Sequence, residues 1–275
     1  MTVQEQAPAP RKNDGVFVFL YDEGTETKLS VSEIAGYLRE QLPRAQVDAR
    51  GEFVGHHTTN ERLDGLALAL ARIKVTDPTR QLADRKPLFG EVNFERERLH
   101  AGNRGAFGVI YDGLEVQAAM RGLLLREEAS RTHAHIIFSN RLLATWEQSD
   151  LRYHLRVIVG GSPALISTSG AVEAPAKPRE FYQAKEQLGA DPLVYERIKA
   201  EFAGRFLDHD DERLTEVLKG YALQVVLYQF TGQGFCANPA CRLYNAHWQE
   251  EMLRAQLDGI VCGKHARLLA SLRER

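Results

Sequence analysis

All three cysteines of this chain fall within its last forty residues, and their spacing constrains the fold more than any other feature. Cys236 and Cys241 form a Cys-x4-Cys pair, and twenty residues further on Cys262 and His265 form a Cys-x2-His pair. Two close pairs of donors joined by a linking segment are typical of a chain that surrounds a tetrahedral Zn²⁺. The alternative interpretation is that the three cysteines are buried in the core as small apolar residues and bind no metal. The sequence predicts one structural zinc on these four residues, with His247 as the alternative fourth ligand.

The stretch around Cys236 resembles the archaemetzincins, a family of zinc peptidases. Their pattern is HExxHxxGxxH, a cysteine directly after it, a Cys-x4-Cys-x-Met pair and a closing Cys-x2-Cys. The cysteines of this chain and Gly232 match that pattern, whereas Leu243 stands at the methionine and His265 at the last cysteine. The resemblance covers roughly forty residues and implies a metzincin-like arrangement in which Arg213–Phe230 is the former active-site helix.

The catalytic positions of that pattern do not match. Val225, Gln229 and Phe235 stand where the family has its three histidines, and Val226 stands at the glutamate. Valine and phenylalanine have no lone pair for a metal, glutamine is a weak ligand, and Val226 cannot take a proton from water. The resemblance therefore implies a peptidase scaffold that has lost its catalytic zinc site and has no catalytic residues.

Composition narrows the class of protein. The 275 residues are 44% hydrophobic, enough for a large core, and the formal net charge of −2 gives no indication of a polyanion or membrane partner. The longest apolar run, Gly65–Ala71, is far too short to cross a bilayer, and the N-terminus has no signal pattern. Cysteines with metal-like spacing suit a reducing compartment, so we expect a cytoplasmic protein.

The first half of the chain shows alternating strand and helix signals after a flexible tail at Met1–Asp14. We expect strands at Gly15–Tyr21, Ala45–Val54 and Ala106–Tyr111, and helices at Ser30–Leu42, Thr59–Lys74 and Leu114–Glu128. Asp77–Gly105 reads as a charged, solvated loop. Strands follow at Thr132–Phe138, Leu142–Glu147, Tyr153–Val159 and Ala164–Ser169. Their short connections predict antiparallel hairpins.

The proline-containing segment Ala171–Glu180 predicts a boundary, beyond which the pattern is helical. Asp210 is a candidate N-cap for the helix that leads into the cysteines. The fold class is α/β (α+β): a tail at 1–14, a mixed-sheet subdomain at 15–174 and a helical, zinc-bound subdomain at 175–275.

Two further groups of histidines could bind metal. His56 and His57 are adjacent, which favours a polar turn over a metal site because neighbours on a strand point apart. His133 and His135 would share one face of a strand, with His154 on the next, so they form a possible metal site or the polar side of a hairpin.

Three functions remain open. The first is a non-catalytic binding scaffold, whose partner is a protein or peptide, with a cleft lined by the strand histidines, Tyr244 and His247. The second is an active hydrolase using a relocated metal on the strand histidines. The third is a zinc-finger-like nucleic-acid module, which Glu250 and Glu251 beside the cysteines disfavour.

Overall fold

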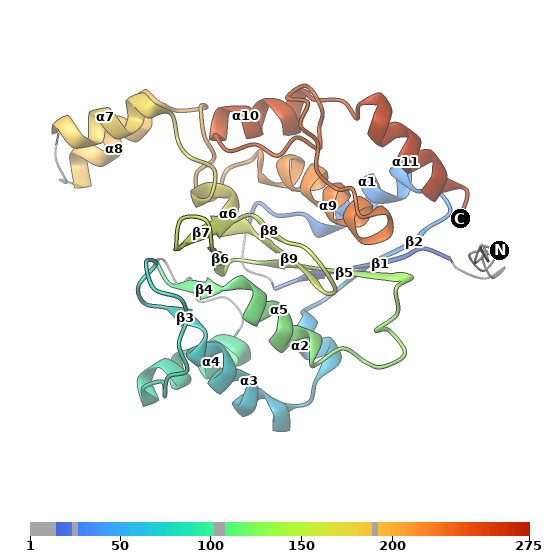
Figure 1. The fold of residues 1–275 in the computed structure, drawn as a ribbon, viewed down its shortest axis with the longest axis horizontal. Coiled ribbons are helices and arrows are strands. Elements are labelled where there is room, and N and C mark those ends of the chain that lie inside the picture. The colour runs from blue at the N-terminus through green and yellow to red at the C-terminus, as the bar shows by residue number, and fades with distance from the viewer. Residues whose placement is uncertain (1–14, 24–26, 102–107, 189–191) are drawn as a thin grey trace, which may run out of the picture.

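The computed structural model describes residues 15–23, 27–101, 108–188 and 192–275, so the predicted tail at 1–14 lies outside the described residues. These residues form a mixed α/β fold with two sheets between layers of helices, which confirms the expected fold class (Figure 1). No helix among them is long and apolar enough to span a bilayer.

The larger sheet has the strand order β2-β1-β5-β9-β8. Its strands are β1 (Phe17–Asp22), β2 (Gln46–Arg50), β5 (His133–Ser139), β8 (Ile158–Val159) and β9 (Ala164–Ser167). The first four in spatial order are parallel, and β8 pairs antiparallel with β9. Parallel strands need helical crossovers that cover both faces, which explains the continuous apolar runs of β1 and β5.

The smaller sheet has the order β3-β4-β6-β7. It contains β3 (Lys74–Val75), β4 (Ile110–Asp112), β6 (Leu142–Glu147) and β7 (Arg152–Arg156). β6 and β7 form an antiparallel hairpin, so β7 is an edge strand. The N–H of Tyr153 donates to the carbonyl of Pro78 at 2.8 Å, which covers part of that edge.

Helices pack on both sides of the sheets (Figure 1). Above lie α1 (Val31–Gln41), α6 (Thr168–Glu173), α9 (Leu214–Thr231), α10 (Gln249–Leu253), the π-helix Arg254–Asp258 and α11 (Gly263–Arg273). Below lie α2 (Phe53–His57), α3 (Asn60–Arg72), α4 (Phe89–Ala101) and α5 (Gly113–Arg121). The pair α7 (Arg179–Leu188) and α8 (Pro192–Glu201) projects to one side around its own cluster of Phe181, Ile198, Phe202 and Phe206.

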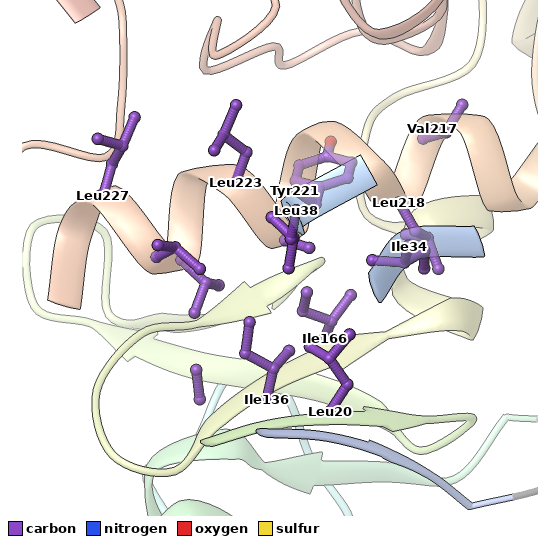
Figure 2. Close-up of a cluster of buried hydrophobic side chains, with 14 of the residues drawn as sticks. Leu20, Ile34, Leu38, Ile136, Ile166, Val217, Leu218, Tyr221, Leu223 and Leu227 are labelled. Atoms are coloured by element: carbon purple, nitrogen blue, oxygen red, sulfur yellow. The ribbon is translucent and has the colours of Figure 1, made fainter. Parts of the chain in front are cut away.

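Strand periodicity divides the core into two clusters. Leu20 on β1 and its neighbours Ile136 and Ile166 face upward, where Figure 2 shows them beneath Leu218 and Tyr221 of α9. Alternate residues of β1 face downward into a second cluster beside α2, α3 and α5. Since α9 supplies buried side chains along most of its length, it anchors the upper layer.

Several predicted elements differ from the structure. β5 and β6 belong to different sheets, and the predicted strand Tyr153–Val159 divides into β7 and β8, so the series of hairpins is wrong apart from β6–β7 and β8–β9. Between β5 and β6 the chain passes from the larger sheet to the smaller one. Buried Arg141 holds this connection, because its N–H donates to Ser139 Oγ and its carbonyl accepts from Ser167 Oγ. Asp77–Gly105, predicted as a loop, contains α4.

The ends of α9 are set by local interactions. Asp210, the predicted N-cap, instead accepts a hydrogen bond from Thr27, and Arg213 stands at the N-cap position. At the other end Gly232 has φ 72°, the left-handed conformation that glycine adopts without steric cost, and its N–H donates to the Tyr228 carbonyl. The predicted turn glycine is confirmed, and the chain reverses there toward Cys236.

Candidate metal centre and adjoining cleft

Short backbone bridges hold the cysteine loops in place after α9. The N–H of Cys236 donates to the Leu243 carbonyl at 2.8 Å, and the N–H of Arg242 donates to the Ile260 carbonyl at 3.1 Å. The first bond folds the Cys236–Cys241 loop on itself, and the second brings that loop against the segment before Cys262. The two pairs predicted from their spacing therefore meet in the fold.

The four predicted ligand side chains gather at one point. Ligand atoms of Cys236, Cys241, Cys262 and His265 all lie within 4.8 Å of one another. Cys236 Sγ and Cys262 Sγ are 3.8 Å apart, and Cys262 Sγ is 3.3 Å from His265 Nδ1. Two sulfurs on a tetrahedral zinc, each about 2.3 Å from it, would be separated by about 3.8 Å. The donor set and its spacing fit Zn²⁺.

The surroundings of the sulfurs also suit a metal. His265 lowers the pKa of Cys262 to about 6, whereas burial raises the pKa of Cys241 to about 11. The backbone N–H of Asn238 donates to Cys236 Sγ and that of Cys262 to Cys241 Sγ, both at 3.4 Å. Such donors stabilise sulfur in its anionic, metal-binding form.

The motif positions on α9 and just after it carry no ligand cluster. Val225 and Val226 are buried in the main core, at 3% and 0% exposure. Gln229 is half-buried near the end of the helix, and Phe235 is 46% exposed. No group of metal-binding side chains within the described residues includes any of these positions.

A cleft opens beside this part of α9. Its volume is about 600 Å³, and it lies between β7 with the start of β8 on one side and α9 with the loop after Cys241 on the other. It is lined by residues 152–158, Gly160, Ala174, Pro175, Tyr221, Tyr228, Phe235, Asn245, Ala246 and His247. A second hollow of about 440 Å³ shares Phe235, Asn245 and His247 with it.

The predicted cleft residues divide between these hollows and another part of the fold. His154 and His247 line the cleft, and Tyr244 lines the second hollow. His133 and His135 lie on β5 against Phe19, and neither lines either hollow. His154 is hydrogen-bonded to Asp150 instead, so the three strand histidines form no metal-binding group in the described part of the chain.

A second group with metal-ligand chemistry, His56, His57 and Glu128, was missed in the sequence. The pair was expected in a polar turn, but it ends helix α2, where His57 is 5% exposed. Arg50 occupies the centre of this group. Its Nη1 lies 3.1 Å from His56 Nε2 and 2.8 Å from Glu128 Oε2. The spacing of Glu128 from the histidines gives no signal that could have predicted the group.

Hydrogen-bond directions fix the proton positions in this group. His135 Nε2 faces the carbonyl of Glu128, so it donates, and His135 Nδ1 then accepts from the Tyr21 hydroxyl. His57 Nε2, 2.9 Å from the same hydroxyl, must therefore donate to it. Burial lowers the pKa of His57 to about 4, which keeps the ring neutral. Arg50 joins Tyr21, His56 and Glu128 in this network, whereas His57 Nδ1 is buried without a hydrogen-bond partner among the described residues.

The site and the fold define a mixed α/β chain with a zinc-type Cys3His cluster behind a long core helix. Its family follows from the whole sequence: the chain belongs to the "Probable metallopeptidase family (DUF6775)", whose family model matches residues 15–272. This confirms the expectation of a metallopeptidase family. No curated protein matches the chain.

Among solved structures, the chain is similar to archaemetzincin from Methanopyrus kandleri, with 11% sequence identity and a TM-score of 0.44. The match covers 96% of this chain and 99% of that one.

Proposed function

We propose that this protein is a non-catalytic member of its family that binds an extended peptide segment in the cleft beside α9. One structural Zn²⁺ on Cys236, Cys241, Cys262 and His265 holds the loops that form one wall of that cleft. The observation that carries the proposal is the α9 segment itself, where Val225 and Val226 occupy positions at which a zinc peptidase needs a ligand and a base.

The chemistry of the cleft supports binding without hydrolysis. A zinc peptidase needs at least three ligands and a carboxylate near the attacking water. The residues that line this cleft offer His154 and His247 as metal donors, and His154 already bonds to Asp150. No carboxylate is present in the described lining. A bound peptide would therefore meet no activated water.

The shape of the cleft supports an extended ligand. β7 is an edge strand, and the N–H of Tyr153 points away from β6 toward Pro78. Because orientation alternates along a strand, Leu155 presents its N–H and carbonyl on the same outer edge. A peptide can pair with the backbone of Leu155 while its side chains contact Tyr228 and Phe235 across the cleft.

The zinc supplies structure in this proposal. Bound as a tetrahedral thiolate–imidazole centre with all four positions filled, it crosslinks the loop after α9 to the start of α11. Cys236 directly follows Phe235 in the chain, and both line the second hollow, so a metal held by Cys236 would fix the wall that carries Phe235.

The test measures binding and cleavage in one experiment. Purified protein is incubated with a pool of synthetic peptides, and mass spectrometry follows intact peptides that co-elute with the protein and new products in solution. The proposal predicts retained intact peptides and no chelator-sensitive products. Phe235→Ser should reduce retention, whereas Phe89→Ser, which changes an aromatic that is 82% exposed on α4, should not. Chelator-sensitive products from the wild type would overturn the proposal.

One observation favours a second candidate, an active hydrolase with a relocated metal. His56, His57 and Glu128 have the composition of a catalytic zinc site. Cleavage that survives in the wild type and is lost in His56→Ala would favour that function. The guanidinium of Arg50 within the group weighs against it.

A further inference from the structure

We infer that the segment bound in the cleft is acidic, with carboxylates that pair with Arg152 and Arg156 of β7 on either side of one apolar side chain. This inference rests on the proposed function and goes beyond it, because it names the chemical class of the partner. It follows from the orientation and pairing of the side chains on β7.

Three basic side chains share one face of β7. Strand residues alternate in direction, so Arg152, His154 and Arg156 point to one side and Tyr153 to the other. The Tyr153 hydroxyl donates to Asp112 Oδ2 at 2.8 Å, which places that opposite face toward the lower layer. The basic face therefore looks across the cleft toward α9.

The carboxylates next to this face leave Arg152 without a partner. Asp150 Oδ2 bonds to His154 Nε2 at 2.7 Å, and Glu147 Oε2 lies 3.8 Å from Arg156 Nη2. Arg152 is exposed, and no ion pair or side-chain hydrogen bond holds it anywhere in the described part of the chain. A guanidinium that stays fully hydrated beside a binding cleft is available to a carboxylate of a ligand.

Other polar side chains of the cleft have the same character. Asn245 and His247 both line the cleft. Neither the side-chain amide of Asn245 nor the ring of His247 bonds to another group among the described residues. The described lining contains basic, amide and aromatic side chains without any Asp or Glu. Charge complementarity therefore selects an acidic ligand over a basic one.

The opposite wall provides an apolar contact. Tyr228 and Phe235 are 43% and 46% exposed, and their ring centroids lie 6.3 Å apart. Gly160 lies against the Tyr228 ring so closely that a Cβ there would stand 3.1 Å from it, which limits movement of the ring toward β8. Exposed aromatic rings held in this way suit a single large apolar side chain of a partner.

The spacing of the basic residues sets the pattern of the ligand. Arg152 and Arg156 are four residues apart on a strand, which corresponds to about 13 Å. The two guanidiniums therefore suit an extended ligand whose carboxylates are four residues apart, with the apolar residue midway between them. The pattern is acidic–x–apolar–x–acidic.

The test uses fluorescein-labelled peptides of the sequence Thr-Glu-Thr-Leu-Thr-Glu-Thr and the counterparts with Gln or Lys at both Glu positions. Fluorescence anisotropy should show the Glu peptide binding about three- to fivefold tighter than the Gln peptide, as expected of a partly exposed ion pair. The Lys peptide should bind weakest. Added salt should reduce the difference between Glu and Gln.

Variants assign the effect to the proposed contacts. Arg152→Gln should weaken the preference for Glu, because only the pair with Arg156 remains, whereas Arg72→Gln, which removes an exposed arginine of α3, should leave it unchanged. Equal binding of the Glu and Gln peptides, together with weaker binding of both by Phe235→Ser, would overturn the charge inference and leave peptide binding intact. Failure of all three peptides to bind, in the wild type as well, would overturn the inference and the proposed function together.

Discussion

Cys236 Sγ and Cys262 Sγ lie 3.8 Å apart, although 26 positions separate the two residues in the chain. No disulfide joins them. The backbone bridge from Arg242 to Ile260 closes the loop between the pairs, and His265 follows on the first turn of α11. The contact between the two cysteines thus ties the end of the core helix α9 to the last helix of the chain.

Loss of one sulfur should release the zinc and destabilise the C-terminal part. Cys241 is completely buried, so Cys241→Ser leaves an incomplete donor set inside the protein. We expect a loss of about 3 kcal/mol or more in unfolding free energy, together with loss of bound zinc. Thermal unfolding and metal analysis of the purified variant measure both.

Ala240→Ser, at an exposed neighbouring position, is the matched control and should keep the zinc and the melting temperature. A Cys241→Ser protein that melts at the wild-type temperature would rule out a structural role for the metal.

The Cys3His group was predictable because its signal is local. The spacing of Cys236, Cys241, Cys262 and His265 places four donors in two turns, and each turn needs only a few residues to form. The turn at Gly232 was predictable for the same reason. A left-handed residue after a helix is a local requirement, and glycine meets it.

The histidine groups were not predictable in this way. Glu128 reaches His57 only because β5 lies beside β1 in the sheet, a pairing between segments far apart in the chain. His133, His135 and His154 seemed close because consecutive strands often form hairpins, whereas β5 and β7 lie in different sheets. Sheet order, which is set by burial on both faces, decided which histidines meet.

Removal of the Arg50 guanidinium should open a second metal site. In the wild type, Arg50 donates to Glu128 through both terminal nitrogens, at 2.8 and 2.9 Å, and its charge takes the place that a cation would fill. We expect one Co²⁺ per wild-type chain and two per chain of Arg50→Met. Only the Co²⁺ ion at the Cys3His group should show thiolate charge-transfer bands, because the additional ion in Arg50→Met would be held by His56, His57 and Glu128.

Arg72→Met is the control for loss of an arginine and should bind a single ion. Two ions in the wild type would mean that the histidine–glutamate group accepts metal without displacement of Arg50. A single ion in Arg50→Met would mean that these three side chains do not form a ligand set.

Stability should fall as the pH falls from about 6.5 to about 4, because of His57. Burial lowers its pKa to about 4 in the folded protein, whereas the unfolded chain binds the proton near the ordinary value of 6.5. Between these values the unfolded state carries more protons, so the free energy of unfolding decreases with falling pH. Chemical denaturation across this range measures the slope. His57 contributes uptake of up to one proton per chain on unfolding, and His133 and His135, whose pKa values burial also lowers, add to the slope.

His57→Phe should have a smaller slope over the same range, since it removes the titrating ring while keeping an aromatic beside Phe53. An NMR titration of the wild type offers a direct check. A His57 resonance that titrates near 6.5 in the folded protein would contradict the proton positions assigned around Tyr21.

The last prediction concerns the three positions on α9 and after it that lack metal ligands. Val225→His, Gln229→His and Phe235→His together would restore three imidazoles, the first two one helical turn apart and the third beyond the Gly232 turn. Val226 stays unchanged, because it is completely buried and a carboxylate there would disrupt the core. The triple variant should bind a second zinc by metal analysis and remain inactive without a general base.

The double variant Gln229→His with Phe235→His, which has two of the three imidazoles, is the control and should bind the second zinc far more weakly. A folded triple variant with a single zinc would show that these three positions do not converge. In that case the proposed lack of peptidase activity would follow from the path of the chain after α9 rather than from the identity of three side chains.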